Sequence, residues 1–524
     1  MSRSRAARGF AVLAAGVAVV ASLRVAHAQE PPPPPDVAPP AATSAAEPAK
    51  PSRLLEFRYD GWTAAFEGDW RLRLTYLTAF QPVDPELIPD AEQPASDWLE
   101  HRLRLAPSIA WQPDGGPLRS LRLVAQADFA EGVIGGDTPP VRAIRDDELD
   151  TADLDYLWSE AVIDRFVVRL GRQGSTWGLG LVADDGTGEA PWGDKRYGDR
   201  VDRLVVRYGG RPGDPAHPWA VAAAVDRPVE DDLTRHGWQD HAWNYVAAVT
   251  YGDGVLEGGL YEAFRLQRNE RDTNTRISLT DGFVRWRADD WKVEAEALIA
   301  VGNTELVATP ASPSQATVLE HGATVSAGYS TESLDALLDA GYASGDGNPF
   351  DDEVTNLTFD PDFNVGLVMF EEYLAGLTAA SAYNLGDPLL VGSPTPGAYL
   401  VETRGGVTNA VYLNPRVTWR EARDAGWEVE LGVLWAHALE DVVDPFASFD
   451  AGGSPRNYLG GPVGDHDLGF EVDGGLGYRI LADEVHVMVG IESGGYWPGA
   501  AFRDASGAKP DAIALVQGRL SARW

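Results

Sequence analysis

The final thirteen residues, A-I-A-L-V-Q-G-R-L-S-A-R-W (residues 512–524), alternate between two kinds of side chain. A period of two residues is that of a β-strand. Such a strand is typical of the closing strand of a transmembrane β-barrel, in which the apolar face meets lipid and the polar face meets the lumen. In a soluble sandwich, the polar face would instead form the outer surface. The apolar face consists of Ala514, Val516, Gly518, Leu520, Ala522 and Trp524, and the polar face of Gln517, Arg519, Ser521 and Arg523.

The same alternation recurs along the chain from about residue 54 to residue 524. Its clearest example is 291–301, where apolar side chains at the odd positions oppose Lys292, Glu294 and Glu296. A repeated helical period is absent. We therefore expect residues 54–524 to form one all-β domain of amphipathic strands. The other segments with clear alternation are 71–76, 100–105, 121–129, 201–208, 427–435 and 470–480.

The connections between these segments alternate in length. Turn-like peptides occur at 288–290, 331–333, 424–426 and 482–484. Long polar stretches occur at 79–97, 183–199, 226–240, 303–318, 344–364, 384–406, 441–466 and 497–510. Short turns at one end and long loops at the other are the arrangement of outer-membrane barrels, and a soluble β-protein has no reason to sort its loops this way. At about 26 residues per strand and connection, the domain holds roughly 18 antiparallel strands, with 16 as the alternative, around an aqueous lumen.

Two segments precede this domain. Residues 1–28 have the pattern of a secretory signal peptide, with Arg3, Arg5 and Arg8 before an apolar core and Ala26-His27-Ala28 as a small-x-small cleavage site. The apolar core is too short to span a bilayer, which takes about 20 residues. Residues 29–53 are rich in proline and alanine and have no periodic apolar face, so we expect a disordered tether that serves as a passive leader.

The composition excludes several classes of function. The chain contains no cysteine, which rules out disulfides, thiol chemistry and cysteine-ligated metals. A net charge of −36 argues against nucleic acid as a partner. No sequence motif of an enzyme is present, so we expect no catalytic activity. The one dense group of histidines and carboxylates is better interpreted as a polar loop; it consists of Asp231, Asp232, His236, Asp240 and His241.

Two stretches resemble a known family. Residues 169–173, R-L-G-R-Q, are followed by Gly178-Leu179-Gly180, and 341–349, G-Y-A-S-G-D-G-N-P, are followed by Phe359-Asp360-Pro361. Both are similar to motifs of the alginate-export-type, or deltaproteobacterial-like, outer-membrane porins. The resemblance covers about thirty residues of the 524. It implies a monomeric barrel of 18 strands that acts as a channel; the best-known member of the family passes an anionic polysaccharide.

Basic side chains recur on the polar face of the strands. Arginine suits the passage of carboxylate or phosphate solutes, because its guanidinium combines a permanent charge with fixed donors. The alternative is that these arginines pair with lumenal carboxylates and hold the wall rigid. The candidates for the solute path are Arg71, Arg73, Arg102, Arg104, Arg122, Arg169, Arg203, Arg207, Arg285, Arg287, Arg416, Arg420, Arg519 and Arg523. The candidate partners are Glu100, Asp128, Glu294, Glu296, Glu428, Glu430, Glu471 and Asp473.

Acidic residues gather in the long loops, which would lie at the cell surface. They include 145–155, Asp184-Asp185, 230–232 and 346–353. Oxygen ligands at Asp346, Asn348, Asp351 and Asp352 have a spacing that Ca²⁺ could use. The alternative is that these charges are merely solvated; no other cofactor is expected.

Taken together, the sequence predicts an exported barrel of the Gram-negative outer membrane. It would pass small or polymeric solutes passively, with lumenal charge setting selectivity and inward-folded loops setting the size limit. The expected partners are the lipid bilayer and its lipopolysaccharide, the barrel assembly machinery through the C-terminal strand, and the solute itself. The alternative function is an occluded barrel that acts as a surface adhesin or structural anchor through its acidic loops.

Overall fold

The structure, a computed structural model, describes residues 55–84, 87–88, 93–137, 150–188, 190, 192–210, 215–231, 241–269, 273–307, 315–393, 397–422, 425–482 and 484–524. The predicted signal peptide and tether lie outside the described residues, so their boundaries stay predictions. In the described ranges, no helix combines the length and the apolar character that a membrane crossing requires.

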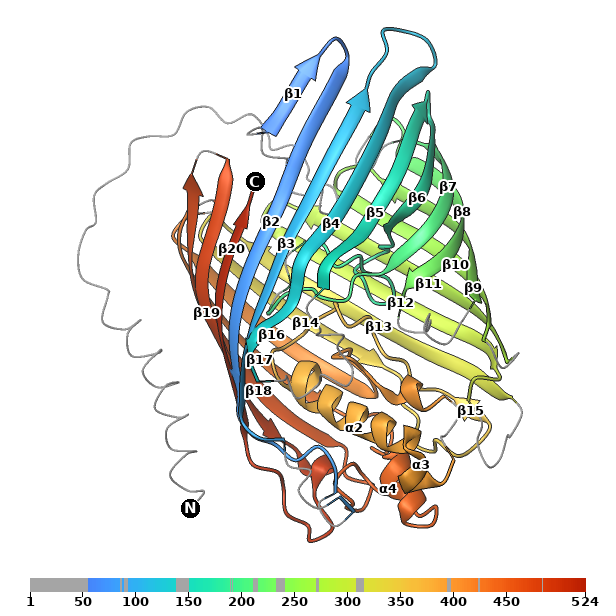
Figure 1. The fold of residues 1–524 in the computed structure, drawn as a ribbon, viewed down its shortest axis with the longest axis vertical. Coiled ribbons are helices and arrows are strands. Elements are labelled where there is room, and N and C mark those ends of the chain that lie inside the picture. The colour runs from blue at the N-terminus through green and yellow to red at the C-terminus, as the bar shows by residue number, and fades with distance from the viewer. Residues whose placement is uncertain are drawn as a thin grey trace, which may run out of the picture. The chain divides into compact units, whose positions relative to one another are not determined.

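Antiparallel strands form a single closed sheet (Figure 1). Within the described residues, the thirteen strands β2–β14 and the five strands β16–β20 pair in sequence order, and β20 pairs back onto β2 to close the ring of eighteen. This confirms the predicted all-β barrel and its larger strand number. The strands are β2 (Trp62–Leu77), β3 (Ser96–Trp111), β4 (Leu118–Gly136), β5 (Asp150–Ile163), β6 (Phe166–Gly174), β7 (Arg200–Gly209), β8 (Trp219–Glu230), β9 (His241–Gly252), β10 (Leu256–Arg268), β11 (Asn274–Ala288), β12 (Trp291–Thr304), β13 (Ala316–Ser330), β14 (Leu334–Ala343), β16 (Ala410–Arg420), β17 (Gly426–His437), β18 (Asp467–Ala482), β19 (Val485–Pro498) and β20 (Ile513–Arg523). Two short strands, β1 (Glu56–Tyr59) and β15 (Glu353–Val354), pair with β2 and β13.

The C-terminal residue lies at the seam that closes the barrel. Trp524 and Gly68 exchange both backbone hydrogen bonds, each 3.0 Å long. The indole ring of Trp524 occupies the space beside Gly68, where an added Cβ atom would lie 2.1 Å from the ring. Glycine is therefore required at this position of β2, and the strand predicted from the last thirteen residues is the closing strand.

The two ends of the barrel differ as predicted. Short connections such as 164–165, 289–290 and 331–333 lie at one end, which we call the turn end. Longer connections lie at the opposite, loop end, although 269–273 is short as well. In outer-membrane barrels the turn end faces the periplasm and the loop end faces outward.

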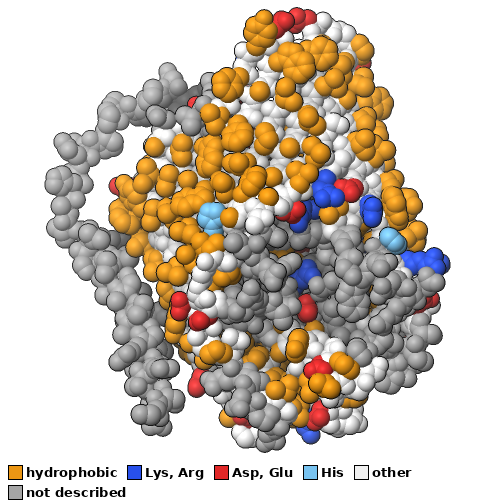
Figure 2. Space-filling model, viewed as in Figure 1, with side chains coloured by type: hydrophobic (Ala, Val, Ile, Leu, Met, Phe, Trp, Pro, Cys, Tyr) orange, Lys and Arg blue, Asp and Glu red, His pale blue; other side chains and the backbone are white. Residues whose placement is uncertain are grey.

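The outer surface of the barrel is an apolar belt (Figure 2). Side chains at alternate positions are exposed on it, including Leu170 at 57% and Leu431 at 58%. Near the turn end, aromatic side chains pair across neighbouring strands with ring centroids 4.9 Å apart; these pairs are Trp219–Tyr251, Trp291–Tyr329 and Trp427–Tyr478. Such a belt with an aromatic girdle meets a lipid bilayer. The chain is therefore a barrel of the Gram-negative outer membrane.

A long connection folds back into the loop-end half of the barrel. Residues 344–409 link β14 to β16 and include helices η3 (Met369–Leu374), α2 (Ala375–Gly386), α3 (Pro388–Val391) and η4 (Ala398–Val401). The sequence predicted two separate loops in this region, 344–364 and 384–406, and no helix between them. A further helix, α4 (Pro445–Asp450), lies in the connection between β17 and β18.

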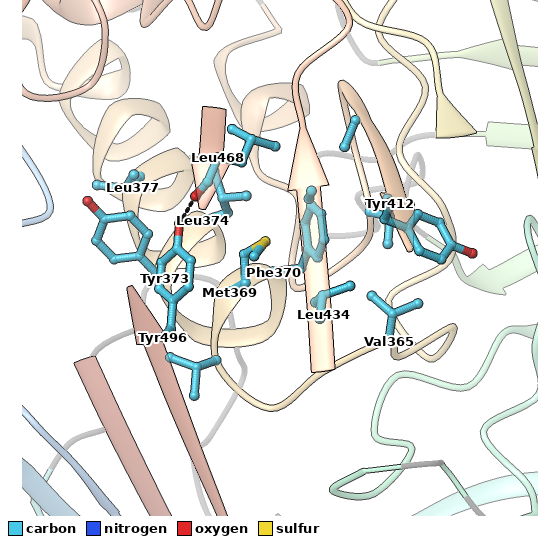
Figure 3. Close-up of a cluster of buried hydrophobic side chains, with 14 of the residues drawn as sticks. Val365, Met369, Phe370, Tyr373, Leu374, Leu377, Tyr412, Leu434, Leu468 and Tyr496 are labelled. Carbon is cyan, nitrogen blue, oxygen red and sulfur yellow. Dashed lines mark hydrogen bonds between the residues drawn. The ribbon is translucent and has the colours of Figure 1, made fainter. Parts of the chain in front are cut away.

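Residues of η3 and α2 are buried against the inner wall (Figure 3). Met369, Tyr373 and Leu377 are fully buried, and Tyr373 packs against Tyr496 of β19 with ring centroids 5.4 Å apart. Because the segment has apolar residues around most of its circumference, it lacks the one-sided period that marks a surface helix in a sequence. We call residues 363–386 the inner segment.

The inner segment is also held by a carboxylate. Glu471 of β18 is fully buried and accepts the backbone N–H groups of Leu367 and Met369 at 2.6 Å and of Val368 at 2.9 Å. The sequence predicted Glu471 as a lumenal partner of an arginine. In the structure, Glu471 instead accepts from backbone N–H groups at the start of helix η3, which have no partner within the helix. Asp473 is buried beside it.

Candidate functional site

The predicted arginines lie on the inner face of the barrel wall. Twelve of the fourteen have a carboxylate within ion-pair distance, and only Arg122 and Arg207 have none among the described residues. The lumenal charges therefore interlock extensively, which is the arrangement that the second interpretation of the arginines expects.

Four arginines of β2 and β3 line a cavity of about 240 Å³ in the lumen. Arg71 and Arg73 alternate along β2, and Arg102 and Arg104 alternate along β3, so that all four point inward. We call these four residues the arginine row. Arg71 is the cross-strand partner of Arg102. Four cations are thereby held on two neighbouring strands.

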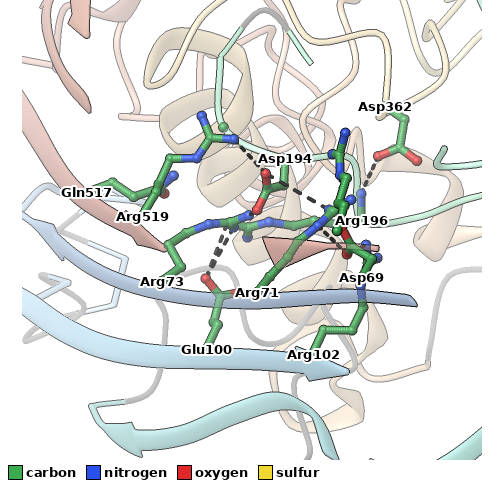
Figure 4. A network of polar contacts seen from close by, with 12 residues as sticks. Asp69, Arg71, Arg73, Glu100, Arg102, Asp194, Arg196, Asp362, Gln517 and Arg519 are labelled. Carbon is green, nitrogen blue, oxygen red and sulfur yellow. Dashed lines mark hydrogen bonds and ion pairs between the residues drawn. The ribbon is translucent and has the colours of Figure 1, made fainter. Parts of the chain in front are cut away.

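Carboxylates hold the arginine row in place (Figure 4). Asp69 accepts from Arg71 at 2.8 Å, from Arg102 at 3.1 Å and from Arg523 at 3.0 Å. Each of these arginines thus has a fixed counter-charge at the wall.

A second carboxylate reaches the row from across the lumen. Asp194 belongs to the connection between β6 and β7, residues 175–199, and it pairs with Arg73 and with Arg519 of β20, the latter at 2.8 Å. Arg71 lies 3.9 Å from the same carboxylate. Asp194 therefore ties an inward-folded connection to three arginines of the wall.

The strands next to the arginine row contribute carboxylates to the cavity. Asp128 of β4 and Asp155 of β5 are buried, and Arg104 binds Asp128 through two hydrogen bonds of 2.6 and 2.7 Å. The cavity lining contains as many carboxylates as cations, and the two kinds are interleaved, since Arg200 pairs with Asp153 and Asp155 beside β4 and β5.

Several guanidinium donors at this cavity have no acceptor. The Nε atoms of Arg73, Arg102 and Arg196, and Nη1 of Arg196, are buried and make no hydrogen bond within the described part of the chain. A buried donor without an acceptor costs about 1–3 kcal/mol. Because these donors have almost no exposed surface, a carboxylate in the cavity would supply acceptors only if the guanidinium groups turned toward it.

The role of the β6–β7 connection was not predicted from the sequence. Asp184 and Asp185 were expected at the cell surface, and no pattern singled out Asp194, Lys195 or Arg196. The structure buries Asp184 inside the barrel, next to Lys195, and places Trp192 fully buried against Gly432 of β17 on the far wall. Asp184 as a surface charge was thus wrong, because a connection that folds inward cannot be distinguished by composition from one that folds outward.

The two inward connections are joined to each other. Asp362 accepts the N–H groups of Arg196 at 2.6 Å and Gly198 at 2.8 Å, and Asp360 accepts that of Asp184 at 3.0 Å. Both carboxylates lie in or next to the Phe359-Asp360-Pro361 motif. The Phe359-Asp360-Pro361 motif, one of the stretches that carry the family resemblance, therefore lies at the joint between these connections.

The protonation of Asp184 gives this joint a dependence on pH. Burial raises the pKa of Asp184 to about 6, although the Lys195 ammonium lowers it; Asp362 and Asp185 also raise it. Because this value lies above the ordinary pKa of 3.8, the docked connection is most stable below pH 4 and loses up to about 3 kcal/mol as the pH rises through 6. We expect hydrogen exchange of amides 184–199, corrected for intrinsic rates, to accelerate between pH 4 and pH 7.

Substitution of Asp184 tests whether its carboxyl group causes this pH dependence of hydrogen exchange. Asp184→Asn should remove the pH dependence, whereas Asp185→Asn should retain most of it, since Asp185 caps its own loop at the N–H of Thr187, 3.0 Å away. An unchanged pH dependence in Asp184→Asn would contradict the assignment.

The other predicted arginines lie elsewhere in the lumen. Arg122 and Arg169 flank the ring of Trp158, with guanidinium-to-centroid distances of 5.6 and 4.2 Å, in a wider cavity of about 960 Å³ at the turn end. Arg207 lines that cavity too and donates to the carbonyl of Gly210. The remaining pairs are Arg203 with Asp226, Arg285 and Arg287 with Glu294, Arg416 with Asp339, and Arg420 with Glu428.

Two of the predicted partners bind backbone groups and not arginines. Glu296 of β12 is buried and accepts the N–H of Leu179 from the β6–β7 connection, and Glu471 holds the inner segment. In both cases a wall carboxylate fixes an inward-folded connection.

The candidate calcium ligands form a compact turn. Asp346 accepts the N–H of Asn348 at 2.9 Å, and Asp351 accepts the side chain of Asn348 at 3.1 Å and the N–H of Glu353 at 2.9 Å. The backbone carbonyl of Asp352 accepts the N–H of Thr317. No group of three or more His, Asp or Glu side chains placed to hold a metal ion occurs in the described ranges. Calcium at this loop stays a prediction.

Comparisons with known proteins concern the fold. No protein-family model and no curated protein matches the sequence. The solved structures to which the chain is similar include three proteins of Pseudomonas aeruginosa. OpdL is 10% identical, over 88% of this chain and 98% of that chain, with a TM-score of 0.49. OpdK, crystallised with vanillate, is 12% identical over the same shares, with a TM-score of 0.47. OccK8 (OprE) is 10% identical over the same shares, also with a TM-score of 0.47.

The resemblance to alginate-export-type porins stays a prediction, because none of these comparisons tests it. The interpretation of the histidine-rich stretch as a polar loop also stays a prediction. Of that group, the structure describes Asp231, which pairs with Arg265 at 2.6 Å, and His241, which lies at the loop end of β9.

Proposed function

We propose that the barrel is a passive channel for small solutes that carry a carboxylate. The observation that supports this most directly is the set of buried guanidinium donors without acceptors on Arg73, Arg102 and Arg196, all at one lumenal cavity. A solute carboxylate would accept from these donors once the guanidinium groups turn toward it, in the planar geometry that arginine favours.

The carboxylates beside the arginine row would orient the solute. Its carboxylate would face the arginine row, and its hydroxyl or ammonium groups would face Asp128 and Asp155 on the neighbouring strands β4 and β5. Passage would require no cofactor, since the solute moves down its own gradient. Such a site must bind weakly enough to release the solute, and the existing ion pairs of the row would compete with it.

A small solute fits this lumen better than a polymer does. The β6–β7 connection crosses the lumen from β6 to Gly432 on the opposite wall, and the inner segment fills space at the loop end. The predicted passage of a carboxylate-bearing polysaccharide would require both connections to move aside. The cavity of about 240 Å³ accommodates one sugar-sized molecule.

A second candidate function is the occluded barrel that serves the cell surface through its acidic loops. It is favoured by the burial of the inner segment, which resembles a plug. The two functions differ in one measurable property, which is conductance.

The proposal is tested by the reversal potential of the purified barrel in a planar bilayer under a KCl gradient. We expect steady conductance with a bias toward chloride. Arg73→Gln combined with Arg102→Gln should shift the bias toward potassium several-fold, since two lumenal cations are lost while their carboxylates remain. The matched control, Arg119→Gln with Arg503→Gln, makes the same change of charge at exposed ion pairs and should leave selectivity unaltered.

Liposome swelling tests the solute class directly. Gluconate should enter faster than glucose of similar size in the wild type, and the difference should disappear in Arg73→Gln/Arg102→Gln. A folded and inserted barrel without conductance would overturn the channel and support the occluded form. A cation bias in the wild type would show that the acidic side dominates.

A further inference from the structure

A cluster of arginines lies on the outer face of the barrel, away from the lumen. Arg172 of β6, Arg227 of β8, Arg268 of β10 and Arg276 of β11 are placed on the same face as the exposed side chains Leu170, Val225 and Phe264. The alternation of the strands directs them away from lumenal residues such as Arg169 and Asp226. We call these four residues the outer arginine cluster.

The register of the sheet places Arg172, Arg227 and Arg276 at one level and Arg268 one rung farther toward the loop end. Arg172 pairs with Asp202, and Asp202 pairs with Arg227. On neighbouring strands, Trp243 pairs with Leu266, which pairs in turn with Arg276. One rung nearer the turn end, the same face carries Leu170, Leu204, Val225, Tyr245 and Phe264. The cluster therefore marks the edge of the apolar belt at the loop end.

The outer face at the loop-end edge of the belt is positively charged, although the whole chain is negatively charged. The protein has a net charge of −36, yet the described outer face at this level of β6–β11 has four arginines and one carboxylate, Asp202. Arg172 and Asp202 form a half-buried ion pair of 3.0 Å. Arg227 and Arg276 are exposed, and neither has a carboxylate within ion-pair distance among the described residues. At the turn end, the equivalent outer positions are aromatic and uncharged, including Tyr208, Trp219, Tyr251 and Trp286.

A permanently charged donor at the edge of an apolar belt lies where lipid head groups lie. We propose that the outer arginine cluster binds the phosphate groups of a phosphorylated glycolipid of the outer leaflet, that is, the lipid portion of lipopolysaccharide. Arg227 and Arg276 are three strands apart, about 14 Å along the sheet. A disaccharide with a phosphate at each end spans such a separation, and its acyl chains would lie along the apolar side chains below.

Inorganic phosphate should bind the outer arginine cluster more weakly than the phosphorylated lipid does. The arginines surround no cavity and lie on an open surface, so an inorganic phosphate would keep most of its hydration and gain little. A lipid adds the contact of its acyl chains with the belt and is already concentrated in the plane of the membrane. The proposal is independent of the function proposed for the lumen.

The test measures binding of lipid A to the purified full-length barrel in neutral detergent, through the rise in its thermal unfolding midpoint during titration. We expect stabilisation of the wild type that weakens with ionic strength. Arg227→Gln combined with Arg276→Gln should weaken the apparent affinity on the order of tenfold. The control Arg119→Gln/Arg503→Gln, which changes exposed arginines elsewhere, should bind as the wild type does.

Two further samples make the result decisive. Arg227→Lys/Arg276→Lys retains the charge and should recover much of the affinity, even where the glutamine variant folds poorly. Dephosphorylated lipid A and inorganic phosphate should each fail to stabilise the wild type. The proposal would be overturned by equal binding of lipid A to the glutamine variant, or by equal stabilisation from either phosphate-free lipid or phosphate alone.

Discussion

Replacing residues 361–405 by two glycines should raise the single-channel conductance of this barrel several-fold. The deletion removes the inner segment, which packs against β18 and β19 in the loop-end half of the lumen. It also removes Asp362, which holds the β6–β7 connection through the N–H groups of Arg196 and Gly198. Both obstacles to flow would therefore be lost or loosened.

The two ends of the deleted segment lie side by side in the structure. Thr358 and Thr408 form an antiparallel bridge, and the N–H of Phe359 donates to the carbonyl of Val407 at 2.9 Å. The chain thus returns close to its starting point, and a short turn can close the stem. Tyr383→Ala is the matched control, because Tyr383 is 65% exposed on α2 and its loss leaves the packing of the helix intact.

Conductance in a planar bilayer, together with heat-modifiable migration to show that the barrel is folded, decides the outcome. An unchanged conductance in the deletion would mean that the inner segment does not limit flow. A conductance that appears only in the deletion would mean that the wild-type barrel is occluded.

The barrel wall could be predicted from the sequence because its determinants are local. Each strand must present apolar side chains to lipid and polar ones to the lumen, so the period of two is imposed on every strand in turn. The 291–301 segment and the last thirteen residues show this period with almost no exceptions. Elsewhere in the wall the period is broken by Glu262, an outward residue of β10 that accepts hydrogen bonds from Ser278 and Thr280 of the neighbouring strand.

The contents of the lumen could not be predicted in the same way. Met369, Phe370 and Tyr373 are buried on several sides at once, so the inner segment has no polar face from which a period could be recognised. Whether a loop folds inward depends on contacts with distant strands, such as Glu471 with Val368 or Trp192 with Gly432. These contacts join residues more than a hundred positions apart in the first case and more than two hundred in the second.

The acidic residues show again that the contents of the lumen could not be predicted from local sequence. The sequence predicted that the acidic loops lie at the cell surface. Asp184, Asp360 and Asp362 are instead buried, and each accepts backbone N–H groups or an ammonium inside the barrel. Irregular segments inside a lumen have many backbone donors without partners, and carboxylates satisfy them. Acidity in these loops is therefore partly a requirement of folding inward.

Asp194→Asn should increase the preference of the channel for anions several-fold. The carboxylate of Asp194 is shared among Arg73, Arg519 and the more distant Arg71. Removing its charge leaves three guanidiniums close together with less compensation, and uncompensated buried charges are costly, about 3–5 kcal/mol when one partner of a pair is lost. Chloride or a solute carboxylate would then be drawn into the cavity to replace the missing charge.

The same substitution weakens the anchor of the β6–β7 connection, and two readouts separate the effects. A change of charge alone shifts the reversal potential under a KCl gradient, whereas a loosened connection also increases conductance and current noise. Asp185→Asn is the matched control, because Asp185 lines the same cavity but caps its own loop and has no described ion pair with an arginine of the row. A reversal potential in Asp194→Asn equal to that of the control would show that ions do not pass the arginine row, and the solute path would then have to lie on another side of the lumen.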